Sequence, residues 1–253
     1  MIALRKGLLV AAWLALTALG PAEDSYLPAD RVPDGIAILP PPPAPGSVAA
    51  LADHAIFEAT RTLKGSARWQ VATEDVTNAP LDRYACAMGI RLTSASAPAL
   101  ARLLDRAGAG DLVARVKAHY QVPRPYLGTD APICEPKTTH LAENGDYPSG
   151  HAANGWLEGL ILADLMPDRA TAILARARAY GESRAVCGSH SASAVQAGWM
   201  AGSAIFATLG ATRGFQRDLE AARGELASVR PRASASDPAQ CKAEQAALAG
   251  RPW

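Results

Sequence analysis

Residues 147–165, YPSGHAANGWLEGLILADL, decide the fold class of this chain. After a Pro-Ser-Gly start, large apolar residues recur at helical spacing from Trp156 to Leu165, whereas Glu158 marks a wetter side. The pattern predicts a strongly apolar helix over 151–165 that faces a core. Ser149 and Gly150 precede this helix and form its expected start.

Further helices are predicted on both sides of this one. They span residues 47–63, 69–88, 96–120 (with a break near Gly108 and Gly110), 167–180, 190–209 and 215–229. A turn is expected at 181–189. Residues 121–150 are rich in Pro, Gly, Thr and Asp and predict a long loop of the kind that usually carries function. We find no alternating strand pattern and no repeat, so the sequence predicts an all-α, single-domain helical bundle.

Residues 1–22 have the order of a secretory signal peptide, with a basic start at Arg5 and Lys6 followed by an apolar run. The alternative is an uncleaved membrane anchor, but the run is shorter than the roughly 20 apolar residues that a bilayer span needs. We therefore expect a periplasmic or secreted protein. The other expected segments are an extended Pro-rich arm at 23–46, the helical domain at 47–229 and a flexible tail at 230–253.

Charge and cysteine content limit the classes of partner. The chain has 25 basic and 24 acidic residues, a balance that gives no field for nucleic acid or an anionic membrane, so any anion site must be a local basic cluster. Export would allow disulfides among Cys86, Cys134, Cys187 and Cys241, for which 3 pairings are open. Their wide, irregular spacing is not that of a zinc site.

Basic, hydroxyl and imidazole side chains gather in three places along the chain. They are Lys117 with Arg124-Pro125, then Tyr147-Pro148-Ser149-Gly150-His151, then Ser183-Arg184 with His190. A phosphate monoester site needs positive charge, planar Arg donors and the N–H groups of a helix start. Phosphoryl transfer also needs a nucleophile and an acid for the leaving oxygen. Taken singly, each cluster has a plainer interpretation, as a helix cap or a solvated face.

Together the three clusters resemble the signature of the class A bacterial non-specific acid phosphatases, K-x6-R-P, P-S-G-H and S-R-x5-H-x3-D. That class shares a superfamily with phosphatidic-acid phosphatases and vanadium haloperoxidases. The stretches YLPADRVPDGIAILPPPPAPGS, NGDYPSGH and SRAVCGSH also look like this class, and the resemblance covers roughly Tyr26 to Leu226.

The resemblance implies a role for each matching residue. His190 would attack phosphorus and become phosphohistidine, and His151 would protonate the leaving alcohol and then activate water. The phosphate oxygens would be bound by Lys117, Arg124, Ser149, Gly150 and Arg184. The resemblance further implies an all-α fold, no metal or other cofactor, a small phosphate monoester as substrate, and a homo-oligomer. The charge balance separately predicts no nucleic-acid partner, and no apolar run beyond the signal region is long enough to span a bilayer, so no membrane is expected for the mature protein.

The sequence departs from the signature at one position, where Ala194 stands in place of the final Asp. That carboxylate would orient the imidazole of His190 and stabilise its positive charge. No nearby residue is an evident substitute from sequence, so lowered turnover is expected. The alternatives are a non-catalytic phosphate-binding relic of the same fold and, in third place, a vanadate-dependent oxidase that uses the same anion pocket.

Overall fold

The computed structural model describes residues 25–250 and 252–253. The predicted signal peptide at 1–22 lies outside these residues. Regular structure in the described part of the chain is helical apart from one isolated bridge between Ile90 and Ala235. The all-α prediction is therefore confirmed.

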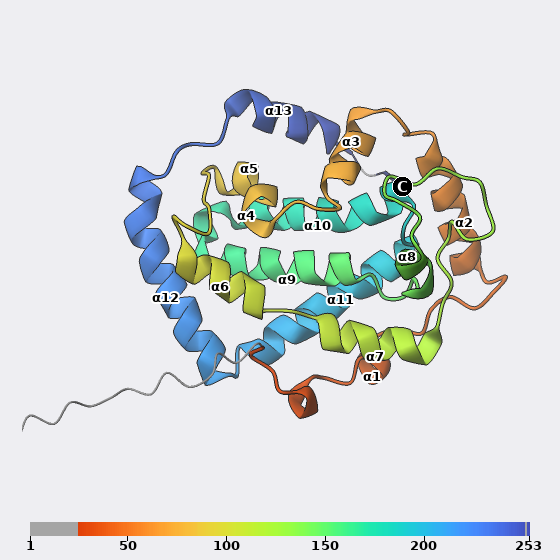
Figure 1. Ribbon diagram of the computed structural model, residues 1–253, viewed down its shortest axis with the longest axis horizontal. Helices are drawn as coiled ribbons and strands as arrows, with labels where there is room; N and C mark the ends of the chain where they lie inside the picture. The colour runs from red at the N-terminus through yellow and green to blue at the C-terminus, as the bar shows by residue number, and fades with distance from the viewer. Residues whose placement is uncertain (1–24, 251) are drawn as a thin grey trace, which may run out of the picture.

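The helices follow one another along the whole described chain (Figure 1). The α-helices are α1 (Gly35–Ile38), α2 (Val48–Arg61), α3 (Ala67–Glu74), α4 (Pro80–Arg83), α5 (Ala85–Met88), α6 (Pro98–Arg106), α7 (Gly110–Tyr120), α8 (Thr139–Glu143), α9 (Gly150–Leu165), α10 (Ala170–Cys187), α11 (Ala192–Leu209), α12 (Arg213–Val229) and α13 (Pro238–Ala247). The short 3-10 turns are η1 (Ala29–Arg31), η2 (Pro167–Arg169) and η3 (Arg230–Arg232).

The predicted apolar helix is α9, which lies at the centre of the molecule between α10 and α11 (Figure 1). Its Leu157, Ile161 and Leu162 have no exposed surface. The neighbouring helices approach closely because small residues meet at the contacts. A Cβ on Gly202 would lie 2.4 Å from the carbonyl oxygen of Ala153, so α9 and α11 touch almost backbone to backbone.

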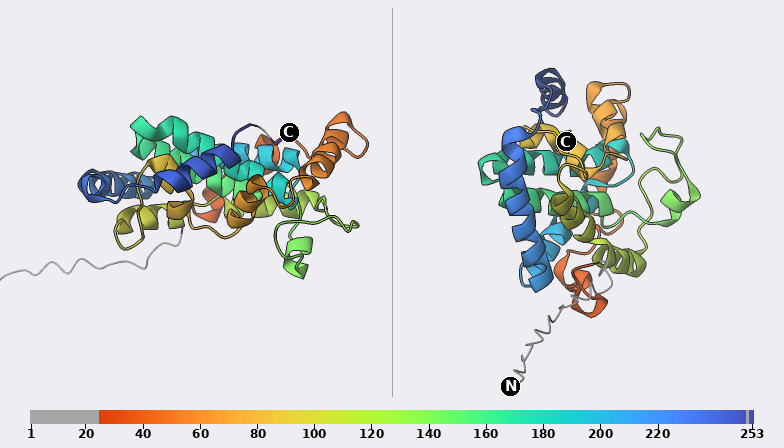
Figure 2. Two further views of the ribbon diagram at one scale, coloured as in Figure 1. Left: turned by 90° about the horizontal axis from the view of Figure 1, so that it is seen from above. Right: turned by 60° about the vertical axis from the view of Figure 1, so that its left-hand side comes forward.

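Three helix ends meet on one side of the molecule. In Figure 1 the last turns of α7 and α10 and the first turn of α9 all lie toward the right-hand end, next to α2 and α8. The loop that carries α8 projects from the body in both views of Figure 2. This arrangement brings together the three sequence clusters, which are far apart along the chain.

Two segments differ from the predicted helix bounds. Residues 181–189, expected to be a turn, are mostly the last part of α10, which ends at Cys187 with Gly188 in the left-handed conformation (φ 84°). Gly181 does not break this helix, because it is needed where Trp199 packs: a Cβ there would lie 2.3 Å from the indole Nε1. The single helix expected at 69–88 is divided into α3, α4 and α5, with Pro80 starting α4.

The C-terminal segment 230–253 differs from the flexible tail that we expected. It contains α13, which is joined to α5 by the disulfide Cys86–Cys241. Glu244 on α13 also pairs with the buried Arg176 of α10 at 2.9 Å. These contacts hold the segment against the body. The N-terminal arm is likewise packed, since the Tyr147 hydroxyl donates to the Pro40 carbonyl at 2.5 Å.

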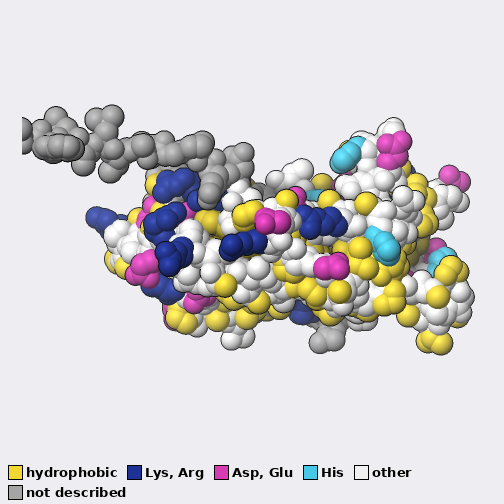
Figure 3. Space-filling model, turned by 90° about the horizontal axis from the view of Figure 1, so that it is seen from below, with side chains coloured by type: hydrophobic (Ala, Val, Ile, Leu, Met, Phe, Trp, Pro, Cys, Tyr) yellow, Lys and Arg dark blue, Asp and Glu magenta, His cyan; other side chains and the backbone are white. Residues whose placement is uncertain are grey.

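Surface charge matches the near-neutral balance of the sequence. The face shown in Figure 3 carries basic and acidic side chains side by side, with apolar surface between them. No helix in the described part of the chain is both long and apolar enough to span a bilayer.

Candidate active site

The predicted residues surround one cavity of about 660 Å³ at the meeting point of the three helix ends. Six of the seven line it directly: Lys117, Arg124, Gly150, His151, Arg184 and His190. The seventh, Ser149, is fully buried just behind the wall and caps α9, where its Oγ accepts from the N–H of Ala152 at 3.3 Å. The structure thus brings the whole predicted set together.

The first turn of α9 forms one wall of the cavity. The backbone N–H of Ser149 is occupied, because it donates to the carbonyl of Ala194 at 2.9 Å. Gly150 leaves space for a ligand, since a Cβ placed on it would meet only Val113 Cγ1 at 3.6 Å. An anion can therefore approach the positive end of this sixteen-residue helix.

Arg184 provides the strongest anion-binding feature. Its side chain comes from the last turn of α10 and has no exposed surface, yet its Nε and Nη1 have no hydrogen-bond partner among the described residues. Burying unsatisfied guanidinium donors is costly unless a ligand completes them. Arg124 is also buried, and its Nε likewise has no partner in the described part of the chain. Unfilled donors on two buried arginines suit a tetrahedral oxyanion.

Lys117 supports the site from the end of α7. Its Nζ donates to the carbonyls of Asn144 and Gly145 at 2.8 and 2.6 Å, which fixes the loop just before α9. Burial, and then the positive charge of Arg124, lower the pKa of Lys117 to about 8. Lys117 therefore adds a basic group to the cavity wall and also holds the loop before α9 in place.

The ring of His190 is held on both sides. Its Nε2 lies 3.0 Å from Arg124 Nη1, and its Nδ1 lies 2.7 Å from the carbonyl oxygen and 3.0 Å from the carboxylate Oδ1 of Asp146. Burial, followed by the charges of Arg124 and Lys117, holds the pKa of His190 well below its usual range. The ring is therefore neutral at neutral pH. The sequence offered no evident substitute for the Asp missing at position 194, whereas the structure places Asp146 against this ring.

His151 also lines the cavity, from the second position of α9. Its ring lies 6.3 Å from that of Tyr180, centroid to centroid, and it makes no hydrogen bond within the described residues. Burial and then the charge of Arg184 hold the pKa of His151 well below its usual range. The imidazole is thus available to a ligand rather than committed to the protein.

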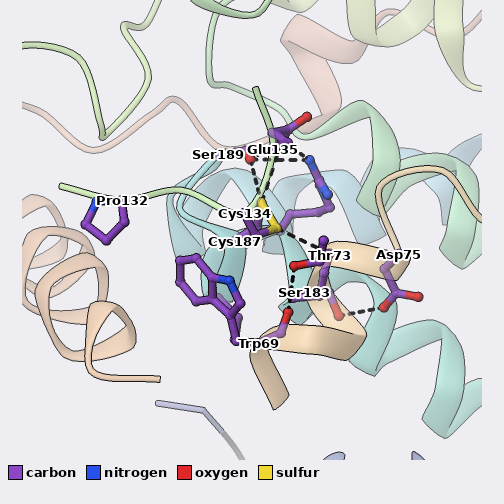
Figure 4. The surroundings of a disulfide bond; sticks show 12 residues. Trp69, Thr73, Asp75, Pro132, Cys134, Glu135, Ser183, Cys187 and Ser189 are labelled. Carbon is purple, nitrogen blue, oxygen red and sulfur yellow. Dashed lines mark hydrogen bonds and ion pairs between the residues drawn. A yellow bond between two sulfur atoms is a disulfide. The ribbon is translucent and has the colours of Figure 1, made fainter. Parts of the chain in front are cut away.

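Two acidic residues of the cavity region were given no role from the sequence. One is Asp146, whose only signal is its place directly before the Tyr-Pro-Ser-Gly-His stretch. The other is Glu135, which pairs with Arg184 Nη2 and accepts from the Ser189 hydroxyl (Figure 4). Its carboxylate occupies one of the donors that an incoming phosphate would use. The pair Arg83 and Glu158 lines the far wall, where burial raises the pKa of Glu158 to about 7.

A disulfide fixes Glu135 in place. The structure joins Cys134 to Cys187 and Cys86 to Cys241, which selects one of the three pairings left open by the sequence. Cys187 is the last residue of α10, so the bridge ties the loop that carries Glu135 to the helix that carries Arg184 (Figure 4). No group of three or more His, Cys, Asp or Glu side chains in the described residues is arranged to hold a metal ion.

Comparison with known proteins places this cavity in context. The family model of the PAP2 superfamily matches residues 98–217, and this range contains all seven predicted site residues. The chain is 44% identical over 220 residues to an acid phosphatase of Zymomonas mobilis subsp. mobilis. The aligned region covers 85% of this chain and 83% of that protein. It is 35% identical to a non-specific acid phosphatase of Providencia stuartii (81% and 86% covered) and 33% identical to one of Salmonella typhimurium (74% and 78% covered).

Proposed function

Because the chain belongs to the PAP2 superfamily, together with bacterial acid phosphatases, we propose that it hydrolyses small phosphate monoesters through a phosphohistidine intermediate on His190. The observation that carries this proposal is the pair of buried arginines, Arg124 and Arg184. Both have guanidinium nitrogens without a partner among the described residues, and both line the same cavity as His190. Such donors suit the equatorial oxygens of a phosphoryl group in transfer.

In the first step, Nε2 of neutral His190 attacks phosphorus while the bond from phosphorus to the ester oxygen breaks. His151, in its protonated form, gives its proton to the leaving alkoxide, and the alcohol departs. In the second step, His151 takes a proton from water as the water oxygen attacks the phosphohistidine. The P–N bond breaks, inorganic phosphate is released and His151 is protonated again. The two steps return both histidines to their starting forms, and the net reaction consumes one water.

Lowered turnover was expected because Ala194 leaves the imidazole of His190 without an orienting carboxylate at that position. The contact between Asp146 and His190 removes the main reason for that expectation. The alternative of a non-catalytic binding relic would keep the same arginines but show no phosphate release. An exported location, as residues 1–22 suggest, would give the protein access to soluble esters outside the cytoplasm.

The test is hydrolysis of p-nitrophenyl phosphate by the parent and by His190→Ala. We expect turnover to fall by about 10³-fold or more when the nucleophile is removed. His54→Ala is the matched control, because His54 is exposed on α2 and does not line this cavity. An alkaline quench followed by mass spectrometry should find a phosphoryl group on His190 in the parent. Full activity of His190→Ala would contradict the mechanism, and phosphate binding without any turnover in the parent would favour the relic.

A further inference from the structure

We propose that Asp146 is the positioning residue for His190, and that it takes the place of the carboxylate that the family signature puts at position 194. This inference rests on the proposed function, since it assumes that His190 is the nucleophile. It concerns a residue outside the signature. It is based on the contacts that the two ring nitrogens of His190 make with Arg124 and Asp146.

The tautomer of His190 follows from its two neighbours. A guanidinium can only donate, so Nε2, 3.0 Å from Arg124 Nη1, must be the unprotonated ring nitrogen. The ring proton is then on Nδ1, where the carbonyl oxygen and Oδ1 of Asp146 can accept it at 2.7 and 3.0 Å. This tautomer puts the lone pair on Nε2, where it accepts from Arg124 in the empty site. Attack on phosphorus then requires Arg124 to turn this donor toward the phosphate.

Asp146 is itself held firmly. Its Oδ1 accepts from the backbone N–H of Ser191 at 3.1 Å and its Oδ2 from the Ser191 hydroxyl at 2.6 Å. Its own N–H donates to the carbonyl of Val122 at 2.8 Å. The carboxylate is therefore fixed on both oxygens, and its negative charge lies beside the ring that becomes positive when phosphorus is attached.

Position 194 offers nothing comparable. Ala194 is fully buried in the apolar core at the start of α11. Its carbonyl is used by the N–H of Ser149, so the residue supports α9 through its backbone. The carboxylate that acts on His190 comes instead from the loop before α9, which Lys117 fixes at the two preceding carbonyls.

A purely structural role is the competing explanation, because Asp146 also caps the chain at Ser191. The molecule offers a matched control for this role. Asp53 accepts from the backbone N–H of Ser193 at 2.9 Å and from the Ser193 hydroxyl, two residues further along the same helix start. Both aspartates thus hold a serine in the same way, but His190 is in contact only with Asp146.

The experiment measures kcat, KM and phosphate affinity in D146N, D53N, A194D and D146A/A194D. Removing the charge in D146N should lower kcat by about 10- to 100-fold, less than the 10⁴-fold effect in serine proteases, because the backbone carbonyl still accepts from Nδ1. KM and phosphate affinity should stay within about 3-fold of the parent, since no phosphate ligand is removed. D53N should keep its kcat. A194D alone should not raise kcat. With D146A measured as the reference, D146A/A194D should recover part of what D146A loses.

Nitrogen NMR of His190 supplies a reading that does not depend on activity. The parent and D53N should show the proton on Nδ1, and D146N should shift that resonance. An Nε2–H tautomer in the parent would overturn the inference even if D146N failed to fold. Parent-like kcat in folded D146N, or equal losses in D146N and D53N, would overturn it as well. Full activity of His190→Ala would instead refute the proposed function, so the two failures are distinguishable.

Discussion

His151 and His190 share one cationic cavity, but within the described part of the chain only the ring of His190 has an acceptor beside it. Burial and neighbouring arginines lower the pKa of both rings, so both are neutral when the cavity is empty. A neutral ring suits the nucleophile but not the acid that protonates a leaving group. A bound phosphate must therefore supply the charge that protonates His151.

We expect inorganic phosphate to raise the pKa of His151 above its value in the empty site. The added negative charge offsets the repulsion from Arg184 and favours the imidazolium form. Because the pKa is higher in the complex, phosphate binding should take up a proton at a pH between the two values. Imidazole NMR across pH, with and without phosphate, measures the shift. The same titration in chloride at equal ionic strength is the control, and an unchanged or lower pKa would contradict the acid role.

Single residues show where sequence reasoning stops. The seven predicted site residues were named from the sequence because their spacing resembles a known pattern. The structure places six of them around one cavity and Ser149 behind its wall. Asp146 and Glu135 were not assigned roles, because their partners His190 and Ser189 lie 44 and 54 residues further along the chain. Both carboxylates sit in a loop region without periodicity, so no pattern predicts what they face.

At the level of elements, the loop between α7 and α8 carries both signs of charge into the cavity. Arg124 lies near its start, and Glu135 lies near its end beside the Cys134–Cys187 bridge. Glu135 neutralises Arg184 in the empty site and occupies Nη2. A phosphate must compete with this carboxylate or bind beside it against its charge.

Glu135→Gln should therefore tighten phosphate binding, lowering KM and the inhibition constant of inorganic phosphate by about 10-fold. It should also lower the melting temperature of the empty protein, because it leaves the buried charge of Arg184 uncompensated. Phosphate should then raise the melting temperature of E135Q more than that of the parent. Thermal unfolding at several phosphate concentrations measures both effects.

Glu143→Gln is the matched control, since Glu143 is an exposed residue of α8 near the same cavity. It removes the same charge without touching Arg184, so its phosphate response should equal that of the parent. A KM for E135Q equal to or above that of the parent would show that Glu135 does not compete with substrate.

The sequence predicted the bounds of some helices better than those of others. The helices α9 and α12 follow their apolar patterns to within a few residues. The end of α10 did not, because a glycine inside a helix looks like a stop when the packing partner, here Trp199, is unknown. The contact between Gly181 and Trp199 is a tertiary contact that the sequence pattern does not reveal, and α10 therefore continues to Cys187.

Across the whole molecule, the geometry of the site depends on how closely α9 and α11 pack. Gly198 on α11 faces the residue that caps α9: a Cβ there would lie 2.7 Å from the Ser149 carbonyl oxygen and 2.8 Å from the Ala152 Cβ. There is no flexible side chain that can move aside at this contact. The distance between α9 and α11 therefore determines where the first turn of α9 lies beside the cavity.

Gly198→Ala should destabilise the protein by about 1–3 kcal/mol or more through overpacking, and it should lower kcat because the first turn of α9 shifts. Gly224→Ala is the counterpart within α12, where a Cβ meets nothing within 4 Å. That change should leave kcat unaltered and stabilise the protein by up to about 1 kcal/mol through helix propensity. Denaturant unfolding and turnover of both variants check the pair; equal stability of the two would contradict the close contact.

The hydrogen bond from His190 to Asp146 also bears on how such chains are recognised. A linear pattern that demands an aspartate four positions after the histidine would class this chain as inactive, since it finds Ala194. A three-dimensional template that asks only for a carboxylate oxygen near Nδ1 would accept it, at 3.0 Å. In this chain that oxygen belongs to a residue 44 positions before the histidine, which a search along the sequence alone would not examine.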